Sequence, residues 1–418
     1  MIQFRSDRMS STNDCAGCEV LMTSSTAVQP DAVQRARELA PAIAARALEA
    51  ERLRRMPDET IAELSRSGLF SLMAPRRYGG DEASLETLVG AVIEVGKVCG
   101  STAWTFCIYG IHNWLAGLFP EQLQDEMFGS VPAGSPLLFP GSWSPSGIAT
   151  PVEGGYKITG RWQFGSGVWH SSWASVAAVV QHEEPPKYPD LRTFMIPRSD
   201  LEVIDTWFTS GLRGTGSMDI AVNDVFVPEH RVQEFGPLAR GQSPSAELHG
   251  SAIYRIPLFC ALSNVAAAPA VGMALGTVEL FTEKIKTRVM RYSMQEQSKL
   301  ATAHRRMGHV AAQAESARTL LLHTVRDVED KLRSGEGLTT GDRVAVRRNC
   351  AYIVEVCKQA IGEAVEACGA SAQYEDSPLQ RHLRDVNTLS THVVYDTDSA
   401  YELYGRVELG LPPGSVAF

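Results

Sequence analysis

The sequence has few of the features that mark membrane, secreted or nucleic-acid-binding proteins. Its first residues contain no continuous apolar stretch of the kind that forms a secretory signal, and no segment approaches the roughly 20 apolar residues of a membrane span. Positive charge is scarce, because 39 Lys and Arg residues face 48 Asp and Glu residues, which gives a net charge of −9. This balance argues against nucleic acid and against an anionic membrane as partners. We therefore expect a cytoplasmic protein.

Familiar metal-binding and catalytic patterns are also missing. No His, Cys, Asp or Glu spacing supports a metal site, and no GxSxG or similar nucleophile motif occurs. Cys15 and Cys18 form a CxxC pair without a second CxxC or a matched histidine pair, which favours chance cysteines in a polar tail over half a zinc site. The closely spaced glycines of Gly211–Asp219 precede a strand-like segment instead of a helix. This order excludes a Rossmann or P-loop site and favours a turn between strands.

What is present is an alternation of helical and β-rich regions. A chain of 418 residues with 44 % hydrophobic content is long enough for two or three packed units. Apolar residues recur at helical spacing on both sides of a central region of short β-rich runs separated by turns. Thr102–Leu118 is expected to form a buried helix and Glu153-Gly154-Gly155 to mark a hairpin, while Cys350, Cys357 and Cys368 are expected to be small core residues on one helix. We expect an α+β fold with a flexible tail over residues 1–28, an N-terminal helical domain over 29–135, an antiparallel β-barrel or sandwich over 136–240 and a C-terminal four-helix bundle over 241–418.

Three groups of side chains are candidates for a site, and each also has an ordinary structural interpretation. The segment Gly160–Trp173 combines small residues with aromatic ones, which suits a flat aromatic ligand or a plain aromatic cluster in the sheet. Arg288 and Arg291 lie three residues apart on an expected helix, where they could grip a phosphate or form a solvated basic face. His112 and His392 are lone histidines in apolar surroundings, so each is a structural residue or a proton carrier.

Five stretches, in this order along the chain, resemble the acyl-CoA dehydrogenase family. The resemblance covers about residues 30–412 and implies the helix–β–helix fold of that family. One of these stretches, TRVMRYS, stands where the family has the pattern Arg–x–x–Phe–Gly. The stretches are LSRSGLFSLMAPRRYGG (64–80), GGYKITGRWQFGSG (154–167), GLRGTGSMDIAVNDVFVPEHRV (211–232), TRVMRYS (287–293) and SPLQRHLRDVN (377–387).

The position of the usual dehydrogenase base distinguishes two chemistries on this fold. Many acyl-CoA dehydrogenases carry a Glu some eight residues after an Arg-Asp pair, where it removes a proton from the substrate. Here the pair is Arg384-Asp385, and the corresponding place holds His392-Val393, with no Glu or Asp between Asp385 and Asp396. The chain is more similar to the oxygenase components of two-component flavin-dependent monooxygenases, which hydroxylate aromatic compounds such as para-hydroxyphenylacetate.

The resemblance implies a cofactor, partners and roles for named residues. The cofactor is reduced FMN or FAD supplied by a separate flavin reductase, with O2 as co-substrate, a C4a-hydroperoxide as the oxygenating species and a small aromatic substrate. His392, His112 and Ser142 fall where these enzymes place catalytic groups, and the family suggests a homotetramer with sites completed across subunits. The residues implied for flavin binding are Trp162, Phe164 along the ring, Gly165, Ser166 near N5, and, at the phosphate from a neighbouring subunit, Arg288, Arg291, Gly369 and Ser371.

Alternatives remain open from the sequence. An acyl-CoA dehydrogenase with a displaced base would share the fold, as would an enzyme that oxygenates nitrogen or sulfur. A binding protein without catalysis is also compatible, since a fold does not fix a function. The substrate pocket is expected to be lined by Thr102–Leu118, by GSWSPSG (141–147) and by residues 245–265, which are apolar and carry no diagnostic charge.

Overall fold

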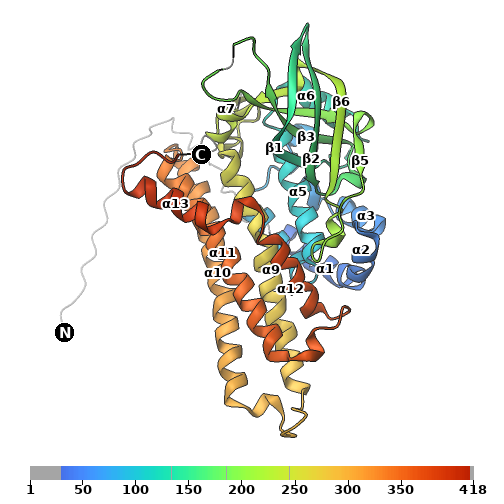
Figure 1. The fold of residues 1–418 in the computed structure, drawn as a ribbon, viewed down its shortest axis with the longest axis vertical. Helices are drawn as coiled ribbons and strands as arrows, with labels where there is room; N and C mark the ends of the chain where they lie inside the picture. The colour runs from blue at the N-terminus through green and yellow to red at the C-terminus, as the bar shows by residue number, and fades with distance from the viewer. Residues whose placement is uncertain (1–29, 133, 185, 244, 415–418) are drawn as a thin grey trace, which may run out of the picture.

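The computed structural model describes residues 30–414 except 133, 185 and 244, so the predicted tail with Cys15 and Cys18 lies outside the described residues. A sheet forms one part of the molecule, and long helices extend away from it (Figure 1). The elements alternate in the predicted order, with helices up to Gly129, strands from Gly141 to Glu234 and helices again up to Glu408. The division of the chain into separate domains stays a prediction.

Among the described residues, six α-helices precede the sheet, and one of them, α5, approaches strand β1 closely where His112 faces Gly141. Helix α5 buries every residue except Ile108, as expected for a helix that is apolar on nearly all sides. The Cys99 sulfur caps its N-terminus by accepting a bond from the Thr102 N–H. The helices are α1 (Pro30–Ala45), α2 (Ala47–Leu53), α3 (Asp58–Arg66), α4 (Leu85–Gly96), α5 (Gly100–Ala116) and α6 (Glu121–Gly129).

The strands form one seven-stranded sheet in the order β5-β6-β2-β1-β3-β4-β7. β1 and β2 are joined by the two-residue turn Glu153-Gly154, which confirms the predicted hairpin. The expectation of a purely antiparallel region was wrong at one place, since β1 and β3 run parallel; closure into a barrel or sandwich stays a prediction. The strands are β1 (Gly141–Val152), β2 (Gly155–Gly165), β3 (Trp173–Val180), β4 (Leu191–Pro197), β5 (Glu202–Ile204), β6 (Met218–Pro228) and β7 (Val232–Glu234).

The C-terminal region is built on three long helices that pack on one another. The fourth long helix of the prediction is replaced by two helices of 12 residues each, of which α12 packs on α11 and α9 and α13 packs on α11. Cys350, Cys357 and Cys368 are buried on α11, as predicted for small core residues. The helices of this region are α7 (Phe235–Ala239), α8 (Ala246–His249), α9 (Leu258–Thr287), α10 (Ala301–Ser334), α11 (Thr340–Cys368), α12 (Pro378–Leu389) and α13 (Thr397–Glu408).

The long apolar stretch that forms helix α9 was not recognised in the sequence, where no segment was expected to approach the length of a membrane span. Of the helices in the described residues, only α9 has the length and apolar composition to cross a membrane. Yet 83 % of its most apolar window is buried inside the protein. Glycines explain part of that burial, because a side chain at Gly272 would meet the Ile93 carbonyl oxygen of α4 at 2.5 Å. α9 therefore packs directly against the backbone of α4, as the core helix of a folded protein does. The cytoplasmic location stays a prediction.

Candidate active site

The end of strand β2 presents a hydroxyl and an aromatic ring side by side. Ser166 follows the strand and is buried, and its Oγ accepts a bond of 3.0 Å from the Trp104 Nε1–H of α5. Phe164 has a positive φ of 67°, where a residue with a side chain is strained by about 1 kcal/mol or more, and its ring is 60 % exposed. A strained backbone that holds an aromatic ring open to solvent is typical of a binding wall.

The neighbours of Phe164 on β2 are core residues. Gly165 is required by packing, since a side chain there would meet Ile220 Cδ1 at 2.6 Å. The Trp162 side chain is fully buried in the sheet, where its Nε1–H donates to the Ala177 carbonyl oxygen at 2.7 Å. Strict alternation would place Trp162 and Phe164 on the same face of the sheet. The pairing of β2 with β6 is instead irregular between Trp162 and Gly165, and the positive φ of Phe164 within this bulge turns its ring out of the core. The Trp162 side chain thus offers no exposed surface within this chain, and its part in flavin binding stays a prediction.

His112 is a buried histidine whose tautomer follows from its partner. Its Nδ1 lies 2.7 Å from the Phe139 carbonyl oxygen, which can only accept, so Nδ1 carries the proton. Burial lowers the pKa of His112 to about 4, so the ring is neutral near pH 7 and Nε2 offers a lone pair. Aromatic rings surround it, with the Phe139 and Trp143 centroids at 5.0 and 5.6 Å.

Ser142 lies next to this histidine on strand β1. A side chain at the preceding residue, Gly141, would meet His112 Cε1 at 2.9 Å, which shows how closely β1 approaches α5. The Ser142 hydroxyl donates to the Gln163 carbonyl oxygen of β2 at 2.7 Å. Its proton is thus committed to the sheet, and only lone pairs remain for a ligand.

His392 has the opposite hydrogen-bonding character. Its Nδ1 accepts from the Val394 N–H at 3.3 Å, so the proton of the neutral ring resides on Nε2. Loss of hydration, and then the positive charge of Arg347, lower the pKa of His392 to about 4. The residue nevertheless keeps exposed surface, and its ring centroid lies 5.5 Å from that of Trp104.

These contacts gather the predicted residues into two groups on one helix. Trp104 links Ser166 and His392, and His112, which adjoins Ser142, lies eight residues further along α5, a rise of about 12 Å. Sequence reasoning had placed the segment containing Trp104 at the pocket but had not singled it out. It could not identify this tryptophan as the link, since the contact joins residues 62 positions apart.

The predicted phosphate residues lie elsewhere and only partly as expected. Helix α9 ends at Thr287, so Arg288 and Arg291 do not share a helix face, and that expectation was wrong. A short two-stranded turn bridged at Val289 and Glu296 follows instead and leaves Arg291 exposed.

Arg288 does meet Gly369. Its Nη1–H donates to the Ala367 carbonyl oxygen at 2.8 Å, and a side chain at Gly369, whose φ is +66°, would meet Arg288 Nη2 at 2.5 Å. The exposed Ser371 follows two residues later, with its Oγ 3.5 Å from the Cys368 carbonyl oxygen. A cavity of about 370 Å³ here is lined by Arg288, Arg305 and Arg306 against the single acid Glu366. This excess of guanidinium groups fits a phosphate, and Phe164 with Ser166 fits a flat ring, so the residues suit a flavin.

A further buried carboxyl group was overlooked in the sequence. Asp385 of α12 accepts a bond of 2.6 Å from the Leu212 N–H, and burial raises the pKa of Asp385 to about 7. It thereby anchors the glycine-rich segment 211–217, which lies between β5 and β6, as predicted for a turn between strands. In the sequence, only the Arg384-Asp385 pair pointed to this position, and it did not indicate that Asp385 would bind the Leu212 N–H.

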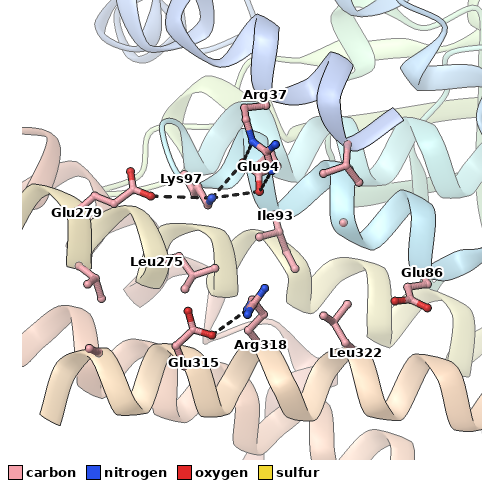
Figure 2. A pocket seen from close by; sticks show the side chains of 14 residues that line it. Arg37, Glu86, Ile93, Glu94, Lys97, Leu275, Glu279, Glu315, Arg318 and Leu322 are labelled. Atoms are coloured by element: carbon pink, nitrogen blue, oxygen red, sulfur yellow. Dashed lines mark hydrogen bonds and ion pairs between the residues drawn. The ribbon is translucent and has the colours of Figure 1, made fainter. Parts of the chain in front are cut away.

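A larger cavity of about 490 Å³ lies away from these groups, between α1, α4, α9 and α10 (Figure 2). Its charged side chains pair with one another: Lys97 lies 3.0 Å from Glu94 and 3.9 Å from Glu279, and Arg318 lies 2.9 Å from Glu315. None of the predicted site residues lines it. Neutralised walls of this kind offer no charge for a ligand, so the cavity is not the candidate site. Within the described ranges no cluster of three or more His, Cys, Asp or Glu could hold a metal ion.

Comparisons with known proteins show the family to which the chain belongs. The N-terminal and C-terminal domains of acyl-CoA dehydrogenase match residues 27–121 and 264–397. The oxygenase subunit HsaA of a flavin-dependent monooxygenase from Rhodococcus jostii is 34 % identical, covering 91 % of this chain and 98 % of its own. The oxygenase component of p-hydroxyphenylacetate 3-hydroxylase from Acinetobacter baumannii is 30 % identical, covering 91 % and 89 %. The structure of XiaF from Streptomyces sp. in complex with FADH2 and glycerol has a TM-score of 0.86 and 30 % identity, covering 92 % and 96 %. The resemblance seen in the sequence is thereby confirmed.

Proposed function

Because this chain belongs to the acyl-CoA dehydrogenase family and, within it, to the flavin-dependent monooxygenases that act as oxygenase components, we propose that it hydroxylates a phenolic or polycyclic aromatic compound. Reduced flavin and O2 are the other reactants, and a separate reductase supplies the flavin. The balance is that one oxygen atom enters the substrate and the other leaves as water, while the flavin loses two electrons and two protons.

The observation that carries the proposal is the opposite character of the two histidines. His112 presents a lone pair at Nε2, and His392 presents a proton at Nε2. Phenol hydroxylation needs an acceptor for the phenolic proton, because the phenolate is the better nucleophile, and a donor for the oxygen that leaves as water. Reduced flavin, when bound, supplies the electrons that activate O2. We assign the acceptor role to His112 with Ser142 and the donor role to His392.

The aromatic surroundings of His112 support an aromatic substrate. Phe139 and Trp143 lie against the imidazole ring, and Phe235 lies edge-on to Trp143 with centroids 6.2 Å apart. The phenolic hydroxyl would donate its proton to the lone pair of His112 Nε2, beside the lone pairs of Ser142 Oγ, while the ring packs on these aromatic faces. Buried, apolar walls also exclude water, which would otherwise compete for the activated oxygen.

The dehydrogenase alternative has less support. Proton removal from a thioester needs a carboxylate base near the flavin. No carboxylate is among the described contacts of Ser166, Trp104 or His392, and Asp385 is bound to the backbone N–H of Leu212. Oxygenation of a thioether sulfur would use the same donor at His392 but would give His112 no proton to accept.

We further propose that the protein is a homotetramer in which Arg288, Arg291, Gly369 and Ser371 bind the flavin phosphate of a neighbouring subunit. The N-terminal end of α5 meets α9 at Met273, since a side chain at Gly100 would lie 2.5 Å from the Met273 sulfur. Arg288 directly follows the last residue of α9, 15 residues beyond Met273 and about 22 Å away. That separation within one chain supports a contribution from a second subunit.

The test uses the purified protein with FMN or FAD reduced under anaerobic conditions, mixed with oxygenated buffer and a panel of phenols. Incorporation of one labelled oxygen from 18O2 into a phenol, at a rate lowered in His112→Asn, would support the proposal. A control panel of acyl-CoA thioesters is offered to oxidised flavin and the same protein. Reduction of the flavin by a thioester, without oxygen incorporation into any phenol, would contradict the proposal.

A further inference from the structure

A row of buried hydroxyls lies directly behind Ser166. Its Oγ is 2.7 Å from Ser217 Oγ, which in turn is 2.7 Å from Thr215 Oγ1. The Thr215 hydroxyl lies 2.8 Å from the Leu212 carbonyl oxygen. Ser166, Ser217 and Thr215, here called the hydroxyl row, are 7 %, 4 % and 1 % exposed, so bulk water does not complete their hydrogen bonds.

The direction of each bond in the hydroxyl row follows from counting protons. A carbonyl oxygen can only accept, so the single proton of Thr215 goes to Leu212. Ser217 must then donate to Thr215, and Ser166 must donate to Ser217, because each hydroxyl has one proton. Ser166 also accepts the Trp104 N–H. One lone pair is therefore all that Ser166 Oγ has left for a ligand.

The end of the hydroxyl row is fixed by the backbone. Leu212 has a positive φ of 51°, its N–H donates to Asp385, and its carbonyl oxygen also accepts the Trp207 Nε1–H at 2.9 Å. Reversing the row would leave that carbonyl without the Thr215 proton and would direct the Ser166 proton away from Ser217. The anchored turn therefore holds the row in one direction.

We propose that Thr215 and Ser217 are positioning residues that make Ser166 an obligatory hydrogen-bond acceptor for flavin N5, so that the protein favours reduced over oxidised flavin. The proposal rests on the proposed function and deepens it. Reduced flavin has a hydrogen at N5 that can be donated to the free lone pair of Ser166. Oxidised flavin has only a lone pair at N5, which would face another lone pair. The hydroxyl row thus selects the flavin form that a reductase delivers.

The experiment compares two dissociation constants on the full-length protein. Oxidised and dithionite-reduced FMN, and the same forms of FAD, are titrated anaerobically, and the ratio of the oxidised to the reduced constant is determined. Ser217→Ala removes the acceptor of the Ser166 proton, which can then turn toward N5 and bind the oxidised form. We expect this ratio to fall about tenfold, the effect of roughly one hydrogen bond.

Thr215→Val provides a second, independent variant. Ser217 would lose its acceptor and donate to Ser166, which again frees the Ser166 proton for the flavin, so the ratio falls as in Ser217→Ala. Thr215→Ser keeps the hydroxyl and should restore the wild-type ratio. Ser171→Ala is the matched control, because that hydroxyl donates to the Val168 carbonyl oxygen outside the row and its loss should leave the ratio unchanged.

The outcomes separate this proposal from the proposed function. An unchanged ratio in folded Ser217→Ala and Thr215→Val proteins, with flavin binding intact in the wild type, would overturn the positioning role alone. A wild-type protein that binds neither flavin in either form would overturn the proposed function and this proposal with it. If Ser217→Ala or Thr215→Val weakened the binding of oxidised and reduced flavin by the same factor, the hydroxyls would have a merely structural role, and the proposal would also be overturned.

Discussion

Replacing His112 by Asn removes one hydrogen-bonding group and keeps another. The Asn amide nitrogen reaches about as far as imidazole Nδ1, so it can still donate to the Phe139 carbonyl oxygen. No atom then stands in the place of Nε2, which we assign as the acceptor of the phenolic proton. General-base assistance contributes about 10²- to 10⁴-fold, so hydroxylation should fall by at least about 100-fold. Affinity for reduced flavin should be unchanged, since the hydrogen bonds of Ser166 are made with Trp104 and Ser217 and not with His112.

The same variant should change the acid stability of the protein. Burial lowers the pKa of His112 from 6.5 to about 4, so the folded state resists protonation, and stability is lost as the pH falls from 6.5 toward 4. At pH 4.5 the loss is about 2.5 kcal/mol. With about 2.1 cal/mol/K of unfolding entropy for each of 418 residues, this corresponds to about 3 °C in Tm. Asn does not titrate, so the variant should lack this part of the decline.

The assay measures labelled phenol formation at pH 7.5 and thermal melting between pH 7.5 and 4.5. His323→Asn, on an exposed part of α10, is the matched control and should behave as the wild type in both. A loss of hydroxylation smaller than tenfold would refute the acceptor role. A difference in Tm between wild type and variant that stays constant with pH would refute the neutral, buried state of the imidazole.

Three further changes test other parts of the site and the fold. His392→Ala removes the Nε2–H donor, so O2 should leave as hydrogen peroxide with hydroxylation at least about 100-fold slower; a matching loss of flavin affinity would contradict the donor role. Arg288→Ala should weaken FMN or FAD about tenfold but leave riboflavin, which lacks the phosphate, unaffected, as isothermal titration would show. Burial raises the pKa of Glu329 from 4.5 to about 7, so its charge destabilises the fold as the pH rises through that range. Glu329→Gln should therefore raise Tm by about 3–4 °C at pH 8 and by less than about 1 °C at pH 4.

Local patterns in the sequence were enough to predict most of the elements. The buried helix α5 and the hairpin at Glu153-Gly154 depend on neighbours within a few residues, and both were predicted correctly. The end of α9 was not, because nothing in TRVMRYS itself stops a helix. There Arg288 leaves the helical path to bind the Ala367 carbonyl oxygen, a partner 79 residues away. Tertiary contacts of this kind override local helix propensity.

In the site, too, some features could be predicted from the sequence and others depend on tertiary contacts. His112, Ser142, Ser166 and His392 were named because the family resemblance pointed to them, but their hydrogen-bonding roles depend on partners that the sequence does not reveal. The two histidines look alike in the sequence. Only the Phe139 carbonyl oxygen and the Val394 N–H make one ring an acceptor and the other a donor.

Strand pairing explains how a residue of the turn comes to govern the end of β2. Gly165 pairs with Met218 in the sheet, which brings Ser217 beside Ser166 although they are 51 residues apart in the sequence. The register is set by burial of alternate residues on both strands, so a shift by one position would break the hydroxyl row and expose core side chains together. The acceptor character of Ser166 is therefore specified by the same packing that makes the sheet. A substitution that preserves the sheet but removes one hydroxyl isolates the chemical effect from the structural one.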